Sequence, residues 1–112
     1  MKATIFVGSS LNDLRAFPEE ARREAGFEID QLQRGEEPSD WRPMSQIGAG
    51  VREIRIHAGG AFRIIYVAAF DESVYVLHAF RKKTQTTSKR DIDLASERLK
   101  QLLAARKRKK TR

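Results

Sequence analysis

The chain of 112 residues has room for one domain with a single core, and 40% hydrophobic and 33% charged residues are typical of a globular protein. The absence of cysteine excludes disulfides and zinc–thiolate sites, and no apolar run approaches the roughly 20 residues of a membrane span or resembles a secretory signal, so we expect a cytoplasmic protein without a membrane partner. The net charge of +7 favours a polyanionic partner, of which nucleic acid is the commonest.

The first third of the chain predicts a short strand followed by two helices. The β-branched and aromatic run 3–7 is typical of a strand, and Gly8 ends it. Ser9 or Ser10 is suited to cap a first helix, and Pro18, followed by two glutamates, is suited to begin a second. Apolar residues recur at steps of three or four until Gly35, and both helices therefore present one stripe to a core: Leu14, Phe17, Ala21, Ala25, Ile29 and Leu32.

The middle of the chain predicts a loop and then three strands. Segment 36–50 contains two prolines and two glycines without a sustained period, so we expect a loop that Trp41 anchors on the core. Strands follow at 51–57, 61–70 and 73–80, spaced for an antiparallel meander. A three-residue turn at 58–60 pairs Arg55 with Arg63. A two-residue turn at 71–72 would bring His78 to the face that carries Arg63.

The last element is an amphipathic helix that starts near Thr87 or Ser88, where Ser88 and Asp91 resemble a capping box. Apolar positions stop at Ala105, so we expect a domain over 1–105 and a frayed, basic, flexible tail over 106–112. The predicted fold is α+β: a small twisted, mostly antiparallel sheet of an N-terminal strand and a three-stranded meander, with two N-terminal helices and one C-terminal helix.

Cations gather on one face of the predicted sheet and on its rim, together with residues that can move a proton. Cleavage of RNA by its own 2′-hydroxyl requires removal of a proton, stabilisation of a phosphorane and protonation of the leaving oxygen, and arginine and lysine can assist without a metal ion. Judged by residue type alone, the residues of this group are equally consistent with side chains that are simply exposed to solvent at the ends of strands. They are Arg55, Arg63, Lys82, Lys83, His57 and, depending on register, His78 and Glu53.

Six segments in a fixed order carry a family resemblance. They are Gly-Ser-Ser-Leu-Asn-Asp-Leu, Phe-Pro, Trp-Arg-Pro-Met, Gly-Val-Arg-Glu-Ile-Arg-Ile, Phe-Arg-Ile-Ile-Tyr-Val and Leu-His-Ala-Phe-Arg-Lys-Lys-Thr-Gln. In this order, and over about residues 3–100, the chain resembles the phage-derived HigB-like branch of the RelE/ParE toxin superfamily. The resemblance implies a type II toxin that cleaves mRNA on the ribosome, by attack of a 2′-hydroxyl on the adjacent phosphate, without a cofactor or metal ion. Its implied partners are the ribosome, mRNA and a cognate antitoxin of the helix-turn-helix type.

The same resemblance implies roles for individual residues. Arg63 would contact the scissile phosphate, Arg55 would stabilise the transition state, and Lys82 and Lys83 would bind phosphate or protonate the leaving group. The general base is left open among His78, His57 and Glu53, because the tyrosine of the RelE type is absent after Tyr75 and Glu53 stands where some relatives carry lysine. Further contacts with RNA are expected from Arg52, His57, Arg81, Lys89 and Arg90.

Two other functions fit the same features. A catalytically silent domain that binds RNA or the ribosome would keep the fold and the cations but lack an effective base. A structural component of a phage particle is the third possibility, and the cationic face argues against it.

Overall fold

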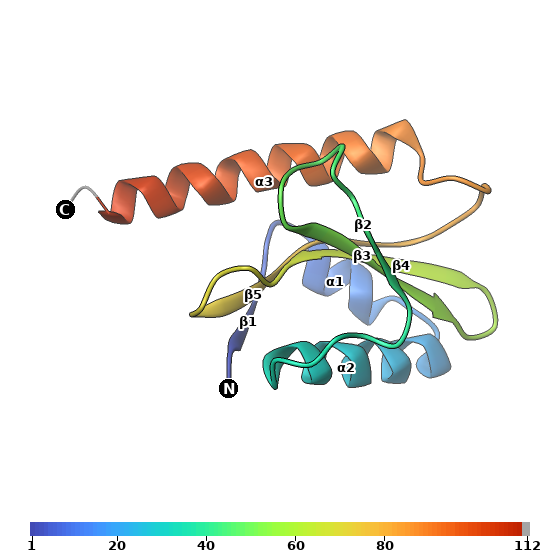
Figure 1. The fold of residues 1–112 in the computed structure, drawn as a ribbon. Helices are drawn as coiled ribbons and strands as arrows, with labels where there is room; N and C mark the ends of the chain where they lie inside the picture. The colour runs from blue at the N-terminus through green and yellow to red at the C-terminus, as the bar shows by residue number, and fades with distance from the viewer. Residues whose placement is uncertain (111–112) are drawn as a thin grey trace.

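Within residues 1–110, which a computed structural model describes, the chain forms three helices and five strands (Figure 1). In chain order these are β1 (Ala3–Phe6), α1 (Ser10–Arg15), α2 (Glu19–Gln33), β2 (Trp41–Pro43), β3 (Val51–His57), β4 (Ala61–Val67), β5 (Ser73–Arg81) and α3 (Lys89–Lys110). The strands form one sheet of order β1-β5-β4-β3-β2, in which β1 is parallel to β5 and the other neighbours are antiparallel. The predicted α+β class is confirmed.

The sheet separates two apolar clusters, with α1 and α2 on one face and α3 on the other (Figure 1). All six residues of the predicted apolar stripe of α1 and α2 are buried. On the other face, α3 buries Ala95, Leu99 and Leu102 against one half of the sheet. Arg55 and Arg63, farther along the same face, belong to neither apolar cluster. Among the described residues, no helix is long and apolar enough to cross a membrane.

The hairpin of β3 and β4 has the predicted register, with Arg55 opposite Arg63. Since alternate residues of a strand point to opposite faces, both arginines share the face of Glu53. The predicted loop is wrong at Trp41–Pro43, which forms β2 and pairs with residues 52–54. A three-residue strand is too short to show an alternating pattern, and Pro43 is tolerated because β2 lies at the edge of the sheet.

A register shift between β4 and β5 determines the direction of His78. Ile65 pairs with His78 whereas the next residue, Tyr66, pairs with Val76, so Leu77 is an extra residue in β5. The shift puts His78 on the face of Ile65 and Arg63. The predicted two-residue turn at 71–72 would also have brought His78 to this face. It is absent, because the connection between β4 and β5 spans residues 68–72.

Both ends of α3 are anchored by side chains. At its start, the backbone N–H of Asp91 donates to Ser88 Oγ at 3.2 Å, which agrees with the predicted cap. Near its other end, the guanidinium of Arg106 lies 3.7 Å from the ring centroid of Phe70 and pairs with Glu72. The helix continues through Lys110, past the predicted end at Ala105. The flexibility expected of 106–112 stays a prediction, and residues 111–112 lie outside the described part.

Arg98 joins α3 to the start of the chain. Its side chain is buried and donates to the carbonyl of Leu77 and to Ser9 Oγ, both at 2.8 Å. Gly8 lies directly beside this guanidinium with φ of +60°, and a Cβ at Gly8 would be 2.6 Å from Arg98 Nε. Arg98 therefore serves the fold, although it belongs to the basic C-terminal segment of the sequence.

We expect Gly8→Ala to lower the free energy of unfolding by about 1–3 kcal/mol, because alanine disfavours positive φ and its methyl group would displace Arg98. The matched control is Gly26→Ala in α2, where the added Cβ meets nothing within 4 Å, and a gain of about 0.5–1 kcal/mol is expected. Urea unfolding of the three proteins measures both changes. Equal changes of the same sign would contradict the packing of Gly8 against Arg98.

Candidate nucleic-acid interface

The half of the sheet face that carries Arg55 and Arg63 is organised around one buried carboxylate. Glu53 on β3 is fully buried and accepts hydrogen bonds from Arg42 Nε at 2.9 Å and from Thr87 Oγ1 at 2.7 Å. Arg42 also donates to Thr87 Oγ1 at 3.1 Å. Arg63 Nε on β4 lies 3.8 Å from the same carboxylate. Glu53 thereby ties together β2, β4 and the loop before α3.

Arg63 lies below the surface. Its residue is 5% exposed, and Nη1 donates to the carbonyl of its neighbour Phe62 at 2.9 Å. Burial lowers the pKa of Arg63, the Glu53 carboxylate counteracts this, and the nearby Arg55 and Arg42 lower it further. Nε is buried without a hydrogen-bond partner among the described residues. The family resemblance implies that Arg63 contacts a phosphate, and this contact stays a prediction. In the structure the side chain lies beside Glu53.

Three cations around Arg63 are more accessible. The side chain of Arg42 is 33% exposed and that of Arg55 is 36% exposed, while Lys82 at the end of β5 is half-buried. Burial, followed by the charges of Arg63, Arg42 and Arg55, lowers the pKa of Lys82, with Glu53 acting in the opposite direction. We call Arg42, Arg55, Arg63 and Lys82 the cationic cluster. Such a group of positive charges on an open sheet face attracts phosphate.

His57 lies at the rim of this surface. Its side chain is 65% exposed, and Nε2 is 3.4 Å from Asp40 Oδ2. Asp40 also lies 4.0 Å from Arg55, so one carboxylate contacts both His57 and a member of the cationic cluster. Of the three candidate bases, this imidazole is the most open to solvent.

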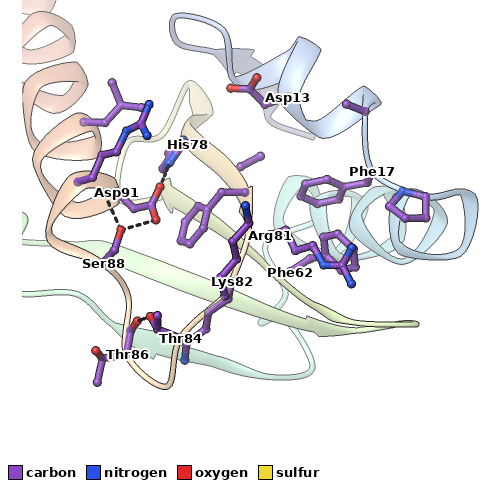
Figure 2. A pocket seen from close by; sticks show the side chains of 17 residues that line it. Asp13, Phe17, Phe62, His78, Arg81, Lys82, Thr84, Thr86, Ser88 and Asp91 are labelled. Carbon is purple, nitrogen blue, oxygen red and sulfur yellow. Dashed lines mark hydrogen bonds and ion pairs between the residues drawn. The ribbon is translucent and has the colours of Figure 1, made fainter.

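His78 lies in a groove of about 750 Å³ between the starts of α2 and α3 (Figure 2). Its Nε2 is 2.7 Å from Asp91 Oδ1, and Ser88 Oγ donates to the other oxygen of Asp91 at 2.7 Å. The ring stacks on Phe80 at 4.6 Å between centroids, and Nδ1 is buried without a partner in the described part of the chain. Both nitrogens are thus withdrawn from solvent, and His78 links β5 to the cap of α3. Its role as a base stays a prediction.

The remaining predicted RNA contacts are dispersed. Arg81 reaches over the ring of Phe62 on the opposite sheet face, at 5.6 Å, and Lys83 and Arg90 line the groove. Lys89 is exposed and pairs with Asp93. Arg52 is separated from the cationic cluster because it lies on the face of α1 and α2.

Arg52 is engaged with neighbours of its own. It lies 4.0 Å above the ring of Trp41 and pairs with Glu37 at 2.8 Å. Burial raises the pKa of Tyr66 to about 12, although the nearby Arg52 opposes this. These contacts hold the Arg52 side chain within the fold, and its contact with RNA stays a prediction.

Arg42 and Thr87 were not predicted as site residues. Arg42 lies in the segment that was predicted to be a loop. The sequence nevertheless contained a signal for it, because the Trp-Arg-Pro-Met segment with Arg42 and the segment with Glu53 are both among the six segments that carry the family resemblance. Thr87 was considered only as a helix cap. Its contact with Glu53, 34 positions away, leaves no local pattern.

One comparison with known proteins identifies a family. The model of the family described as phage derived protein Gp49-like (DUF891) matches residues 12–100. The match begins in α1 and ends in α3, so it includes the cationic cluster and the groove. No curated protein matches the chain.

We expect Glu53→Gln to destabilise the fold by about 3 kcal/mol, because it leaves the buried Arg63 without a compensating charge. Glu37→Gln is the matched control, since Glu37 pairs with Arg52 at the surface with a side chain 60% exposed, and its loss should cost less than about 1 kcal/mol. Urea unfolding at neutral pH compares the two. Similar small effects would mean that Glu53 does not hold the cationic cluster together.

Proposed function

The chain belongs to the Gp49-like family of phage-derived proteins, and from this premise we propose that it is a type II toxin of the HigB-like branch of the RelE/ParE superfamily, which cleaves mRNA on the ribosome. The observation that carries the proposal is the cationic cluster on the half of the sheet face beyond the apolar contacts of α3. The toxin would act in the cytoplasm and be held inactive by a helix-turn-helix antitoxin.

The reaction uses the accessible cations directly. The 2′-oxygen of a ribose forms a bond to the adjacent phosphorus, the bond from phosphorus to the 5′-oxygen breaks, and the products are a 2′,3′-cyclic phosphate and a 5′-hydroxyl. Arg42 and Arg55 bind the phosphate as its charge increases, and the buried Arg63 adds positive potential from below. Lys82, whose pKa is lowered, donates the proton to the leaving oxygen. Lys83, exposed beside it, binds a neighbouring phosphate.

Of the three candidate bases, we assign proton removal to His57. Glu53 is buried and hydrogen-bonded to two side chains, and both nitrogens of His78 are withdrawn from solvent. His57 is exposed and lies beside Asp40, which can stabilise the imidazolium that proton removal creates. In this proposal the ribosome aligns the 2′-hydroxyl with the phosphate.

A catalytically silent RNA- or ribosome-binding domain is the alternative. The engagement of Glu53 and His78 favours it, because two of the three candidate bases are committed to contacts within the fold. Such a domain would use the cationic cluster to bind phosphates and leave them intact.

Induction of the protein in growing cells, followed by mapping of mRNA 5′ ends, tests the proposal. We expect new ends at a fixed position within codons of translated RNA, carrying a 5′-hydroxyl, and none in untranslated RNA. The induced His57→Ala variant is the control for indirect degradation and should give far fewer ends. Arrest of translation without new ends would support the silent domain, and rapid cleavage of free RNA by the purified protein would contradict dependence on the ribosome.

For Lys82 we expect Lys82→Ala to lower the rate of mRNA cleavage on purified ribosomes by on the order of 10² or more. Lys82→Arg should restore mRNA binding but little of the rate, since arginine keeps its proton at every usable pH. In the wild type the rate should fall as the pH rises through the lowered pKa of Lys82, because a general acid must be protonated. Lys100→Ala, an exposed lysine of α3, is the matched control. Full activity of Lys82→Arg would limit Lys82 to binding phosphate.

A further inference from the structure

Arg42 and Glu53 are joined by a third side chain, that of Thr87 in the segment between β5 and α3. Thr87 Oγ1 donates to one oxygen of Glu53 at 2.7 Å and accepts from Arg42 Nη2 at 3.1 Å. Arg42 Nε donates to the other oxygen of Glu53 at 2.9 Å. The three side chains therefore form a closed ring of hydrogen bonds. Thr87 is 7% exposed, so water has little access to its hydroxyl.

The ring occupies only one edge of the Arg42 guanidinium. A guanidinium carries five N–H groups in one plane, and those of Nε and Nη2 on the same side form one of its edges. Glu53 and Thr87 each accept from one N–H of this edge. The edge between Nη1 and Nη2 has no hydrogen-bond partner among the described residues, and the side chain is 33% exposed. Such an edge can donate to two oxygens of one phosphate.

The contact with Thr87 fixes the orientation of this guanidinium. A single hydrogen bond from Nε to Glu53 would leave the group free to tilt about that bond. The second contact, from Nη2 to Thr87, fixes the plane, because Glu53 and Thr87 are both buried and cannot move with it. A donor that is held in place before its ligand arrives loses less conformational entropy on binding.

Helix capping does not explain the Thr87 side chain. The cap of α3 is formed by the next residue, since the backbone N–H of Asp91 donates to Ser88 Oγ. The hydroxyl of Thr87 is instead directed at Glu53, on the other side of the segment that connects the sheet to the helix.

We propose that Thr87 is a positioning residue, which fixes the plane of the Arg42 guanidinium so that its free edge is directed at a phosphate of bound RNA. Thr87 acts through Arg42 and does not touch the RNA itself. The positioning role rests on the proposed function only in so far as RNA binds at the cationic cluster, and it does not require cleavage.

The test measures how variants of the full chain bind a fluorescent oligodeoxyuridylate, which has no 2′-hydroxyl and therefore cannot be cleaved by one. We expect Thr87→Val, which keeps the shape and removes the hydroxyl, to weaken binding roughly tenfold. Thr87→Ser keeps the hydroxyl and should bind within about twofold of the wild type. Thr84→Val is the matched control and should bind like the wild type, because Thr84 is exposed and its hydroxyl donates to the carbonyl of Thr86. Urea unfolding shows that each variant is folded.

Two further measurements separate positioning from a general loosening of the fold. In Thr87→Val the slope of log affinity against log salt should fall by about 0.7, the value of one phosphate contact with a single strand. In an Arg42→Ala background, Thr87→Val should have no additional effect, because Thr87 acts only through Arg42. A threonine with a merely structural role would leave the salt slope unchanged and would add its effect to that of Arg42→Ala.

Binding by Thr87→Val that equals binding by the wild type would overturn the proposal, as would effects of Thr87→Val and Arg42→Ala that add. If Thr87→Val does not fold, ¹⁵N NMR of the wild type decides. The oligonucleotide should shift the Nε–H signal of Arg42 and leave that of Arg23 unchanged, since Arg23 is exposed on α2 and pairs with Glu19. An unshifted Arg42 signal would refute the positioning role. Oligonucleotide binding without new mRNA ends in cells would refute cleavage alone and leave this role standing.

Discussion

The carboxylate of Glu53 is the interaction on which the polar half of the sheet depends. It is fully buried, yet it contacts side chains from β2, β4 and the loop before α3. Without it, the buried guanidinium of Arg63 and the neighbouring Arg42 would repel each other across a region of low dielectric constant. An apolar residue at this position could fill the space, but it would not hold cations from three segments of the chain in one place.

The placement of α3 divides the sheet face into an apolar core and a polar half that carries the candidate site. His78, Asp91 and Ser88 hold its first turn beside β5, and Arg98 and Arg106 hold its later turns on the opposite half of the face. The apolar contacts of the helix therefore end before Arg55 and Arg63. The groove and the cationic cluster meet at the end of β5, where Lys82 belongs to both.

The candidate residues divide by burial into those that can touch a substrate and those that support them. Arg42, Arg55, Lys82 and His57 are accessible, whereas Arg63, Glu53 and His78 are not. Residue type alone could not make this division, because arginine and histidine occur both in sites and in buried networks. Under the proposed function, the accessible group would contact the substrate and the buried group would hold it in place.

Sequence alone determined the parts of this protein that depend on neighbours along the chain. The apolar stripe of α1 and α2, the register that pairs Arg55 with Arg63 and the Ser88 cap all follow from local spacing. Tertiary structure decided the three-residue strand β2, the extra residue in β5 that turns His78, and the burial of Arg63 and Arg98. These features depend on contacts between distant residues, such as Glu53 with Thr87 and Ser9 with Arg98, which are separated by 34 and 89 positions. Local periodicity carries no information about such pairs, because each is formed only when the packed sheet brings its two segments together.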